Sequence, residues 1–226
     1  MLAHTARLLP HGALGHLGWL RGAVGAGLGI GVTAIATALL LRYFAPGLPM
    51  ILAPMGASAV LLFGLPASPL AQPWPVIGGN VVAALAGLVA GMALDTPLPA
   101  AVVAVALAIA AMSVLRCLHP PGGGTALLYA LGATGAEHWD WLYLVPVLVN
   151  GLALACAGWL YNNLTGHQWP HRLVVPVAPA LPSEPAPITR EDVVRVLDEW
   201  NEVLDVGPED LLAFVQAVDR QRGKNP

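Results

Sequence analysis

The sequence predicts an all-α polytopic membrane protein, a bundle of membrane helices followed by a small C-terminal helical hairpin. Apolar residues make up 57% of the 226 residues and charged residues only 10%, whereas a soluble domain carries about 25% charged residues. Residues 1–171 hold four Arg and three acidic residues, while the last 55 residues hold six Lys/Arg and ten Asp/Glu. Several uncharged stretches also have the length, roughly 20 residues, that crosses the hydrocarbon layer of a bilayer.

Four stretches meet the requirements of an uninterrupted membrane span: residues 22–41, 76–94, 98–115 and 142–161. The first three end at a charged residue, and the last ends at a pair of asparagines. The residues before the first span lack the compact apolar core and the cleavage site of a secretory signal peptide, so cleavage there is not expected.

Two further apolar stretches are interrupted by Pro and Gly. They are residues 46–65 (PGLPMILAPMGASAVLLFGL) and 117–135 (CLHPPGGGTALLYALGATG). Pro removes an amide donor and Gly weakens a helix, so neither stretch can be a continuous lipid-facing helix. We predict that each is a discontinuous or re-entrant helix.

The positive charges favour six membrane crossings over four, with both termini in the cytoplasm. If both interrupted stretches cross, only Arg42 lies outside, and the inner side holds Arg7, Arg21, Arg116 and Arg172. If neither crosses, the same five arginines divide three to two. Five tryptophans lie near the predicted span ends, as is typical of interfacial indoles: Trp19, Trp74, Trp139, Trp141 and Trp169.

The two interrupted stretches resemble each other. A shift of 66 positions aligns APMGASAVLLFGL (53–65) with HPPGGGTALLYAL (119–131) at five identical residues, and the next span of each half carries one asparagine, Asn80 or Asn150. A repeat of three crossings inserts its second copy upside down. We therefore predict two inverted three-segment repeats, a plan of many transporters that place the substrate where the broken helices meet.

Each interrupted stretch is expected to begin a half-helix, near Gly56 and near Gly122. The first turn of a helix has unpaired amides and a partial positive charge, so two such starts facing each other would bind a small anion. The predicted substrate site comprises Pro54, Gly56, Ala57, Ser58, Asn80, His119, Pro120, Pro121, Gly122, Gly123, Gly124, Thr125 and Asn150.

Each of these residues also has a structural interpretation. His119 either couples protons or pairs with the anion, or it is a neutral side chain bonded to a carbonyl that the prolines free. Arg116 either attracts anions at the mouth or extends to the membrane surface. Asn80, Asn150, Ser58 and Thr125 would equally suit helix-to-helix hydrogen bonds or caps, and the three consecutive glycines close packing.

Other functions are disfavoured. A net charge of −3 without a basic run argues against nucleic-acid binding. Cys117 and His119 offer two metal ligands where a tetrahedral site needs more, so no metal or cofactor is expected. No nucleophile, acid pair or metal cluster is predicted at the site, so an enzyme is not expected. The pairs Gly25/Gly29, Gly27/Gly31 and Gly87/Gly91 suit close helix packing, within the chain or between subunits of a homo-oligomer.

The chain is expected to divide into a transmembrane domain (1–171), a proline-rich linker (172–188) and a cytoplasmic hairpin (189–226). Thr189 and Asp192 resemble a capping box at the start of a helix with an apolar stripe: Val193, Val196, Leu197, Trp200, Val203 and Leu204. A second helix is expected to open at Gly207-Pro208. The hairpin either is a passive solubilising cap or has a regulatory or assembly role.

The runs LHPPGGGTALL and LAPMGASAVLLFGLPASPLAQPWPVIGGN resemble the HPP family of integral membrane proteins, whose motif is here His119-Pro120-Pro121. The resemblance covers roughly residues 21–164. Family members in plant chloroplasts and cyanobacteria are associated with nitrite transport, so the resemblance implies a small monovalent anion as substrate. It carries over His119, Pro120, Pro121, Gly122 and Gly123, and Pro54, Gly56, Ala57 and Ser58. Many members add a nucleotide-binding CBS pair, for which the tail here is too short.

We therefore expect a multi-pass transporter or channel for a nitrite-like anion in the bacterial inner membrane. Its expected partners are the anion and the lipid bilayer. The alternative is a non-transporting membrane scaffold or sensor subunit that recruits a partner through its C-terminal hairpin.

Overall fold

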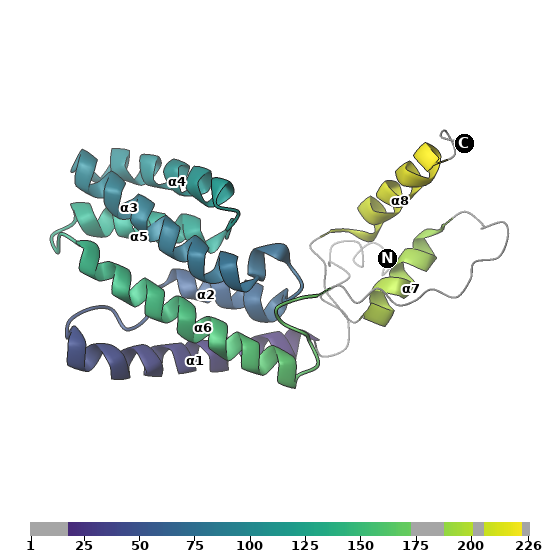
Figure 1. Ribbon diagram of the computed structural model, residues 1–226, viewed down its shortest axis with the longest axis horizontal. Coiled ribbons are helices and arrows are strands. Elements are labelled where there is room, and N and C mark those ends of the chain that lie inside the picture. Colours follow the sequence, from purple (N-terminus) through teal and green to yellow (C-terminus); the bar gives the residue numbers. More distant parts are fainter. Residues whose placement is uncertain (1–17, 173–187, 201–205, 223–226) are drawn as a thin grey trace, which may run out of the picture. The chain divides into compact units, whose positions relative to one another are not determined.

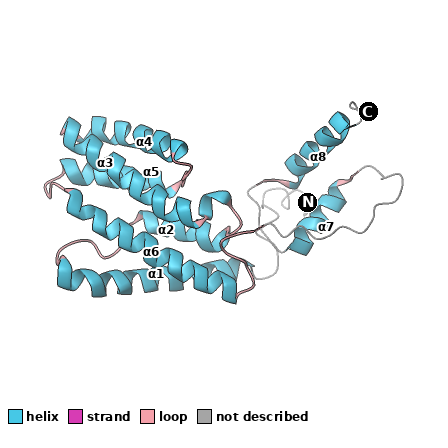
Figure 2. Cartoon of the chain, in the orientation of Figure 1, coloured by secondary structure: helices cyan, strands magenta, loops and turns pink. Residues whose placement is uncertain are grey.

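The computed structural model describes residues 18–172, 188–200 and 206–222, and these residues form helices joined by loops, without strands (Figure 2). The chain divides into two units. One, the membrane unit, comprises residues 16–171, and the other contains the C-terminal helices.

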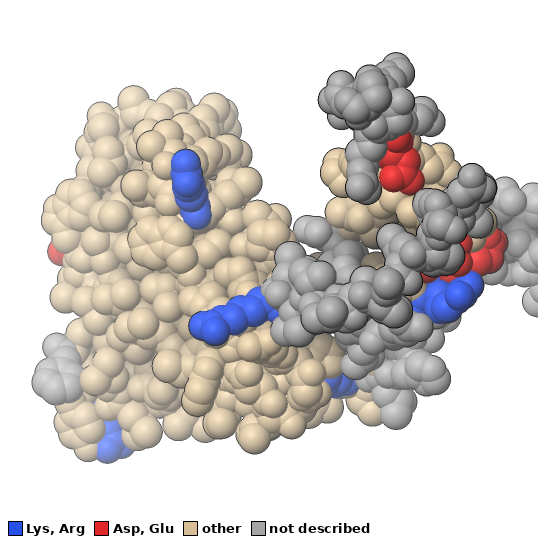
Figure 3. Space-filling model, turned by 45° about the vertical axis from the view of Figure 1, so that its right-hand side comes forward, with Lys and Arg blue, Asp and Glu red and all other residues tan. Residues whose placement is uncertain are grey.

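Four helices of the membrane unit are long and apolar enough to cross a bilayer, which confirms the four predicted spans. They are α1 (Gly18–Phe44), α3 (Asn80–Leu94) with the preceding π-helical turn η5 (Pro75–Gly79), α4 (Pro97–Val114), and α6 (Leu144–Leu164) with the 3₁₀ turn η6 (Trp141–Tyr143). Their outward side chains are apolar, and Figure 3 shows the membrane unit with only isolated charged residues on the visible face. This surface suits contact with lipid.

Both Pro/Gly-rich stretches are interrupted, as predicted. In the first, α2 (Pro54–Ala59) continues into the π-helical turn η3 (Val60–Gly64), and η4 (Pro69–Ala71) follows. In the second, α5 (Pro121–Thr134) begins only after the irregular residues 115–120. Proline stands at the start of both α2 and α5, where a missing amide removes no helical hydrogen bond.

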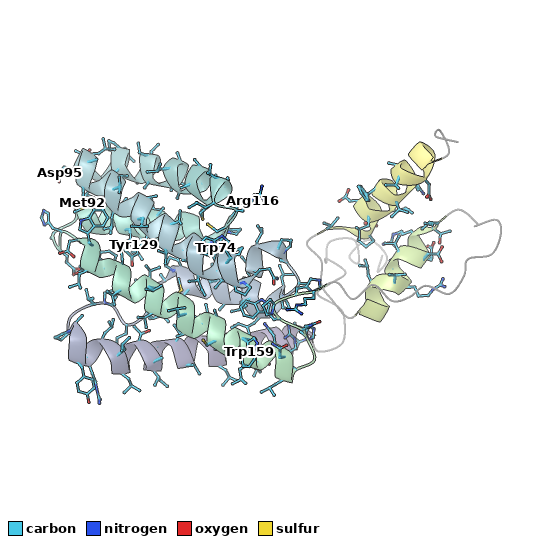
Figure 4. The ribbon with its side chains drawn as sticks, viewed as in Figure 1. Trp74, Met92, Asp95, Arg116, Tyr129 and Trp159 are labelled. Carbon is cyan, nitrogen blue, oxygen red and sulfur yellow. The ribbon has the colours of Figure 1, made fainter. Side chains whose placement is uncertain are left out.

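Successive segments of the membrane unit run in opposite directions (Figure 1). Hydrogen bonds fix which ends lie together: Arg21 at the start of α1 donates to the carbonyl of Phe63 at the end of η3 and to Asn162 near the end of α6. Figure 4 shows Arg116 and Trp159 at this end of the bundle and Asp95 at the other. The interrupted stretches therefore link opposite ends of the bundle, while the six membrane crossings stay a prediction. The inverted repeat itself stays a prediction.

Small residues allow the helices to approach closely. A Cβ at Gly87 of α3 would lie 2.4 Å from the Ala126 carbonyl oxygen of α5, and one at Gly29 of α1 would lie 2.5 Å from the ring of Phe63. The predicted pairs Gly87/Gly91 and Gly25/Gly29 thus pack within the chain. Gly27 and Gly31, in contrast, have no neighbouring heavy atom within 4 Å of a built Cβ.

The C-terminal unit contains α7 (Arg190–Trp200) and α8 (Pro208–Arg222), which pack against each other. The predicted capping box is confirmed: the Thr189 amide and hydroxyl donate to Asp192 Oδ2 at 3.0 and 2.7 Å. The second helix begins at Pro208, as predicted, and Arg190 Nε lies 2.9 Å from Glu209 Oε1 across the two helices. Most of the predicted linker (173–187) and two stripe residues, Val203 and Leu204, lie outside the described residues.

The close α3–α5 contact predicts that Gly87→Ala destabilises the bundle. Overpacking of this kind typically costs about 1–3 kcal/mol, because the Ala126 carbonyl and the Tyr129 Cβ, which would lie 2.7 Å from the new atom, cannot easily move. The midpoint of thermal unfolding in detergent, followed by tryptophan fluorescence, should fall. Gly27→Ala is the matched control and should leave the midpoint unchanged; an equal loss in both variants would contradict the packing.

The cap of α7 predicts a pH dependence. The Thr189 hydroxyl and amide donate to Asp192, and they hold the pKa of that carboxyl below its usual range. The resulting stabilisation is present above the pKa of Asp192 in the unfolded chain and is lost as the pH falls through the lowered folded value. Asp192→Asn should therefore speed amide hydrogen exchange in the first turn of α7 at neutral pH. Asp219→Asn in α8 is the control, and equal exchange at α7 in wild type and Asp192→Asn would refute the cap.

Candidate functional site

Four polar side chains form a buried hydrogen-bonded network between α2, α3 and the start of α5. Ser58, Asn80, His119 and Thr125 each have 0% exposure. Thr125 Oγ1 donates to Asn80 Oδ1 at 2.7 Å, Asn80 Nδ2 donates to Ser58 Oγ at 3.2 Å, and Ser58 Oγ lies 2.9 Å from His119 Nε2. Four predicted site residues from both halves of the chain are thus in one network, which we call the buried network.

The direction of each hydrogen bond in the buried network follows from the Leu70 carbonyl, which bonds to His119 at one end of the network. The Leu70 carbonyl can only accept, so His119 Nδ1, at 2.8 Å, carries the proton and donates to it. In a neutral ring Nε2 is then an acceptor, and the Ser58 hydroxyl donates to it. The second hydrogen of Asn80 Nδ2 goes to the Val76 carbonyl at 2.8 Å. The donors of the buried network are therefore all used within the protein.

Local sequence places His119 in this network. Pro120 and Pro121 supply no amide, so the chain cannot continue as helix before them, and the His119 carbonyl instead accepts from the Gly122 amide at 2.8 Å. Gly79 gives the room: a Cβ there would lie 2.7 Å from the His119 Cβ and 2.6 Å from the Cys117 carbonyl oxygen. Gly79 is not among the predicted site residues, although it stands four residues after Pro75, in a Gly-Gly pair.

The starts of the two broken helices lie side by side. Pro54 Cγ lies 3.8 Å from a Cβ built on Gly124. The first amides of both helices are used, however: Gly56 donates to Ala53 at 3.1 Å and Gly123 to Pro120 at 3.1 Å. The expectation that these amides are unpaired is therefore wrong for this conformation, because short turns precede both helices and accept from them.

A surface hollow of about 480 Å³ is lined by residues of both broken stretches. Its walls are Pro54, Ala57, Val60, Leu61, Pro120, Pro121 and Gly124. Ala57 precedes Ser58 and Pro120 follows His119, so the wall residues adjoin the buried network in the chain. The hollow is apolar, and the four side chains of the buried network, each with 0% exposure, do not line it.

Asn150 lies outside the buried network, and the two aligned glycines Gly56 and Gly122 have different surroundings. Asn150 accepts from the Leu52 amide at 2.9 Å and donates to Thr37 Oγ1 at 2.9 Å, so it holds the loop before α2 and is not part of the buried network. Gly56 and Gly122, aligned in the proposed repeat, differ: nothing lies within 4 Å of a Cβ at Gly56, whereas Met112 Sδ lies 2.9 Å from one at Gly122.

Arg116 lies exposed in the turn after α4, with a left-handed φ of 54°. Trp74 Nε1 donates to the carbonyl of its neighbour Leu115 at 3.0 Å, and Figure 4 shows both labelled side chains at the same end of the bundle. A surface position there fits both predicted roles of Arg116, at a mouth or at the membrane surface.

Arg21 forms a clamp that the sequence had suggested only as a charge before a span. Its NH2 donates to the Phe63 carbonyl at 2.7 Å and its NH1 to Asn162 Oδ1 at 2.9 Å, and it thereby ties η3 to α1 and α6. Trp169 is a correction: it is 3% exposed, and its Nε1 donates to the Ala71 carbonyl at 3.0 Å, so it packs inward and is not an interfacial indole.

In the part of the chain that the structure describes, no group of three or more His, Cys, Asp or Glu could hold a metal ion. The buried polar side chains of these residues are hydroxyls, amides and one imidazole. Such groups are neutral hydrogen-bond partners, and they suit a small ion of low charge better than a coordinated divalent cation.

Comparison with known proteins gives one family and two relatives. The family model for the HPP transmembrane region matches residues 12–170. Two transmembrane proteins of Dictyostelium discoideum are similar: one is 38% identical over 120 residues, 50% of this chain and 38% of the relative. The other is 39% identical over 113 residues, 47% of this chain and 39% of the relative. The matches thus span about two fifths of these relatives' length, and no solved structure matches significantly.

The Arg21 clamp predicts a stability loss in Arg21→Met. Hydrogen bonds to a charged group are each worth about 1.5–3 kcal/mol, and the change leaves the Phe63 carbonyl without this donor. The unfolding midpoint in detergent should fall by several degrees. Arg42→Met is the control, because Arg42 at the other end of α1 is exposed and its guanidinium contacts the neighbouring Tyr43 at the surface. Equal midpoints for the two variants would exclude the clamp.

Proposed function

The chain belongs to the HPP transmembrane family, and we propose that it transports a small monovalent anion, nitrite-like, across a bacterial inner membrane without a chemical step. The buried network that joins the two broken helices is the observation that carries the proposal. The family resemblance adds the substrate class.

A buried polar network adds little to the stability of a bundle of membrane helices. Hydrogen bonds between membrane helices average about 0.6 kcal/mol, and small and apolar side chains pack equally well in lipid. Here Ser58 and Thr125 come from the two interrupted segments, and Asn80 lies between them. Interrupted helices and buried polar side chains at membrane depth are typical of substrate pathways.

The chemistry of the network favours an anion with one charge. A charge near the bilayer centre costs about 2.5–3.5 kcal/mol on insertion scales. Hydroxyl and amide donors of Ser58, Asn80 and Thr125 can offset a cost of this size. The described buried side chains include no carboxylate that would repel an anion.

The conformation described here is closed, because the donors of the network bond to one another. We propose that α2 and α5 separate at the hollow and that the hydroxyls of Ser58 and Thr125 turn to the anion. Hydrogen bonds within the protein are then exchanged for hydrogen bonds to the substrate, so the two states can lie close in free energy. We further propose that both termini are cytoplasmic, which the charge distribution favours. Homo-oligomerisation stays a prediction.

The proposal predicts that purified protein in liposomes moves nitrite and that Ser58→Ala slows it by at least about tenfold, since a hydrogen bond to a charged group is worth about 1.5–3 kcal/mol. Uptake of labelled nitrite measures the rate. Ser113→Ala is the matched control, because the exposed Ser113 hydroxyl donates only to Ile109 within α4, at 2.7 Å.

Absence of flux above empty liposomes for nitrite, nitrate and formate would refute transport. In that case deletion of residues 189–226 tests the scaffold alternative, in which the hairpin recruits a partner and complex formation is lost with the deletion.

A further inference from the structure

We infer that His119 is the binding site of a proton that crosses together with the anion, so that the protein is an electroneutral cotransporter of one proton and one monovalent anion. This inference rests on the proposed function. It follows from the hydrogen-bond directions of the buried network and from the charges around it.

His119 is the titratable member of the buried network. The groups that face it from neighbouring elements are the Ser58 hydroxyl of α2, the Leu70 carbonyl of η4 and, beyond Ser58, the Asn80 amide of α3. On its own segment Cys117 is buried and Arg116 is exposed. The described buried residues include no Asp or Glu, so a charge on His119 has no carboxylate as a partner within the described bundle.

A proton added at Nε2 reverses one hydrogen bond. In the neutral ring Nε2 accepts from Ser58, 2.9 Å away, while Nδ1 donates to Leu70. After protonation Nε2 becomes a donor, and the Ser58 hydroxyl loses its acceptor. Asn80 already donates to Ser58 Oγ, so two donors meet there and the hydroxyl hydrogen of Ser58 has no acceptor in the network.

An anion supplies the hydrogen-bond acceptor and the negative charge that the protonated network lacks. The imidazolium Nε2–H and the Ser58 O–H can then both donate to it, and the net charge of the occupied site is zero. An ion pair with hydrogen bonds costs far less in the membrane than either ion alone. Proton and anion binding therefore strengthen each other by the same factor. Release reverses the step: the proton leaves Nε2 for water with the anion, and Ser58 donates to Nε2 again.

Liposomes with a proton gradient or a membrane potential test the inference directly. At zero potential, set with potassium and valinomycin, an inward gradient of about one pH unit should drive accumulation of about tenfold, because one proton enters with each anion. A potential imposed without a proton gradient should drive none. Nitrate is used beside nitrite, because nitric acid is fully ionised at neutral pH and so does not carry nitrate across bare lipid. Empty liposomes measure the passage of neutral nitrous acid, which is subtracted from the nitrite signal.

His119→Gln replaces the imidazole by an amide, which can form hydrogen bonds but cannot take up the proton, so this variant should lose accumulation driven by the proton gradient. His138→Asn is the matched control: His138 is exposed, has a left-handed φ of 45° that asparagine tolerates, and should behave as wild type. Proton uptake by the protein in weakly buffered detergent gives a second readout. Added nitrite should cause uptake of about one proton per bound anion in wild type and in His138→Asn, and none in His119→Gln.

The outcomes separate the two proposals. Anion flux in wild type that follows the potential and ignores the proton gradient overturns proton coupling and leaves anion transport intact. Proton uptake with nitrite that persists in His119→Gln overturns the assignment to His119. Absence of any anion flux in wild type overturns both proposals. If His119→Gln fails to fold, the comparison of gradient and potential in wild type still decides whether protons are coupled.

Discussion

The hydrocarbon core of a membrane contains no water, so every polar group placed there must find its partner within the protein. This constraint explains most of what distinguishes the bundle. Where the helices are continuous, their backbone groups pair internally and apolar side chains can face lipid. Where proline and glycine interrupt a helix, short turns before α2 and α5 take up the freed amides and carbonyls. The four buried polar side chains between these breaks pair with one another for the same reason.

Pairing of this kind has a functional side. A side chain that donates its hydrogen bond to a side chain of another segment can change its partner with little loss of free energy. A backbone group that is hydrogen-bonded within a regular helix cannot. The hydroxyls of Ser58 and Thr125 belong to the first kind, since each donates to a side chain of another segment. Asn150 uses its oxygen and nitrogen on a loop and on α1, and it holds the backbone around the site.

The sequence was sufficient for the fold class, because span length, charge and the Pro/Gly breaks are local properties. It predicted the four long helices, both interruptions, and the residues that share the buried network. It could not predict that Asn80 and Asn150 have unrelated partners, since helix rotation depends on packing. The inward position of Trp169 depends on the carbonyl of Ala71, which is distant in sequence, and the Pro/Gly pattern did not indicate the local turns that use the first amides of α2 and α5. Gly79 and Arg21 were missed because one acts through a contact with the segment around His119 and the other through carbonyl groups.

The Arg21 clamp has a consequence for biogenesis. Arg21 and Asn162 are separated by 141 positions, so the first helix meets its final neighbour only after the last span has left the ribosome. Until then the glycine-lined groove of α1 lies without the ring of Tyr161, which contacts the Gly25 position in the complete bundle. The contact between α1 and α6 thus forms late in synthesis, and a chain truncated before α6 would leave the first helix without this partner.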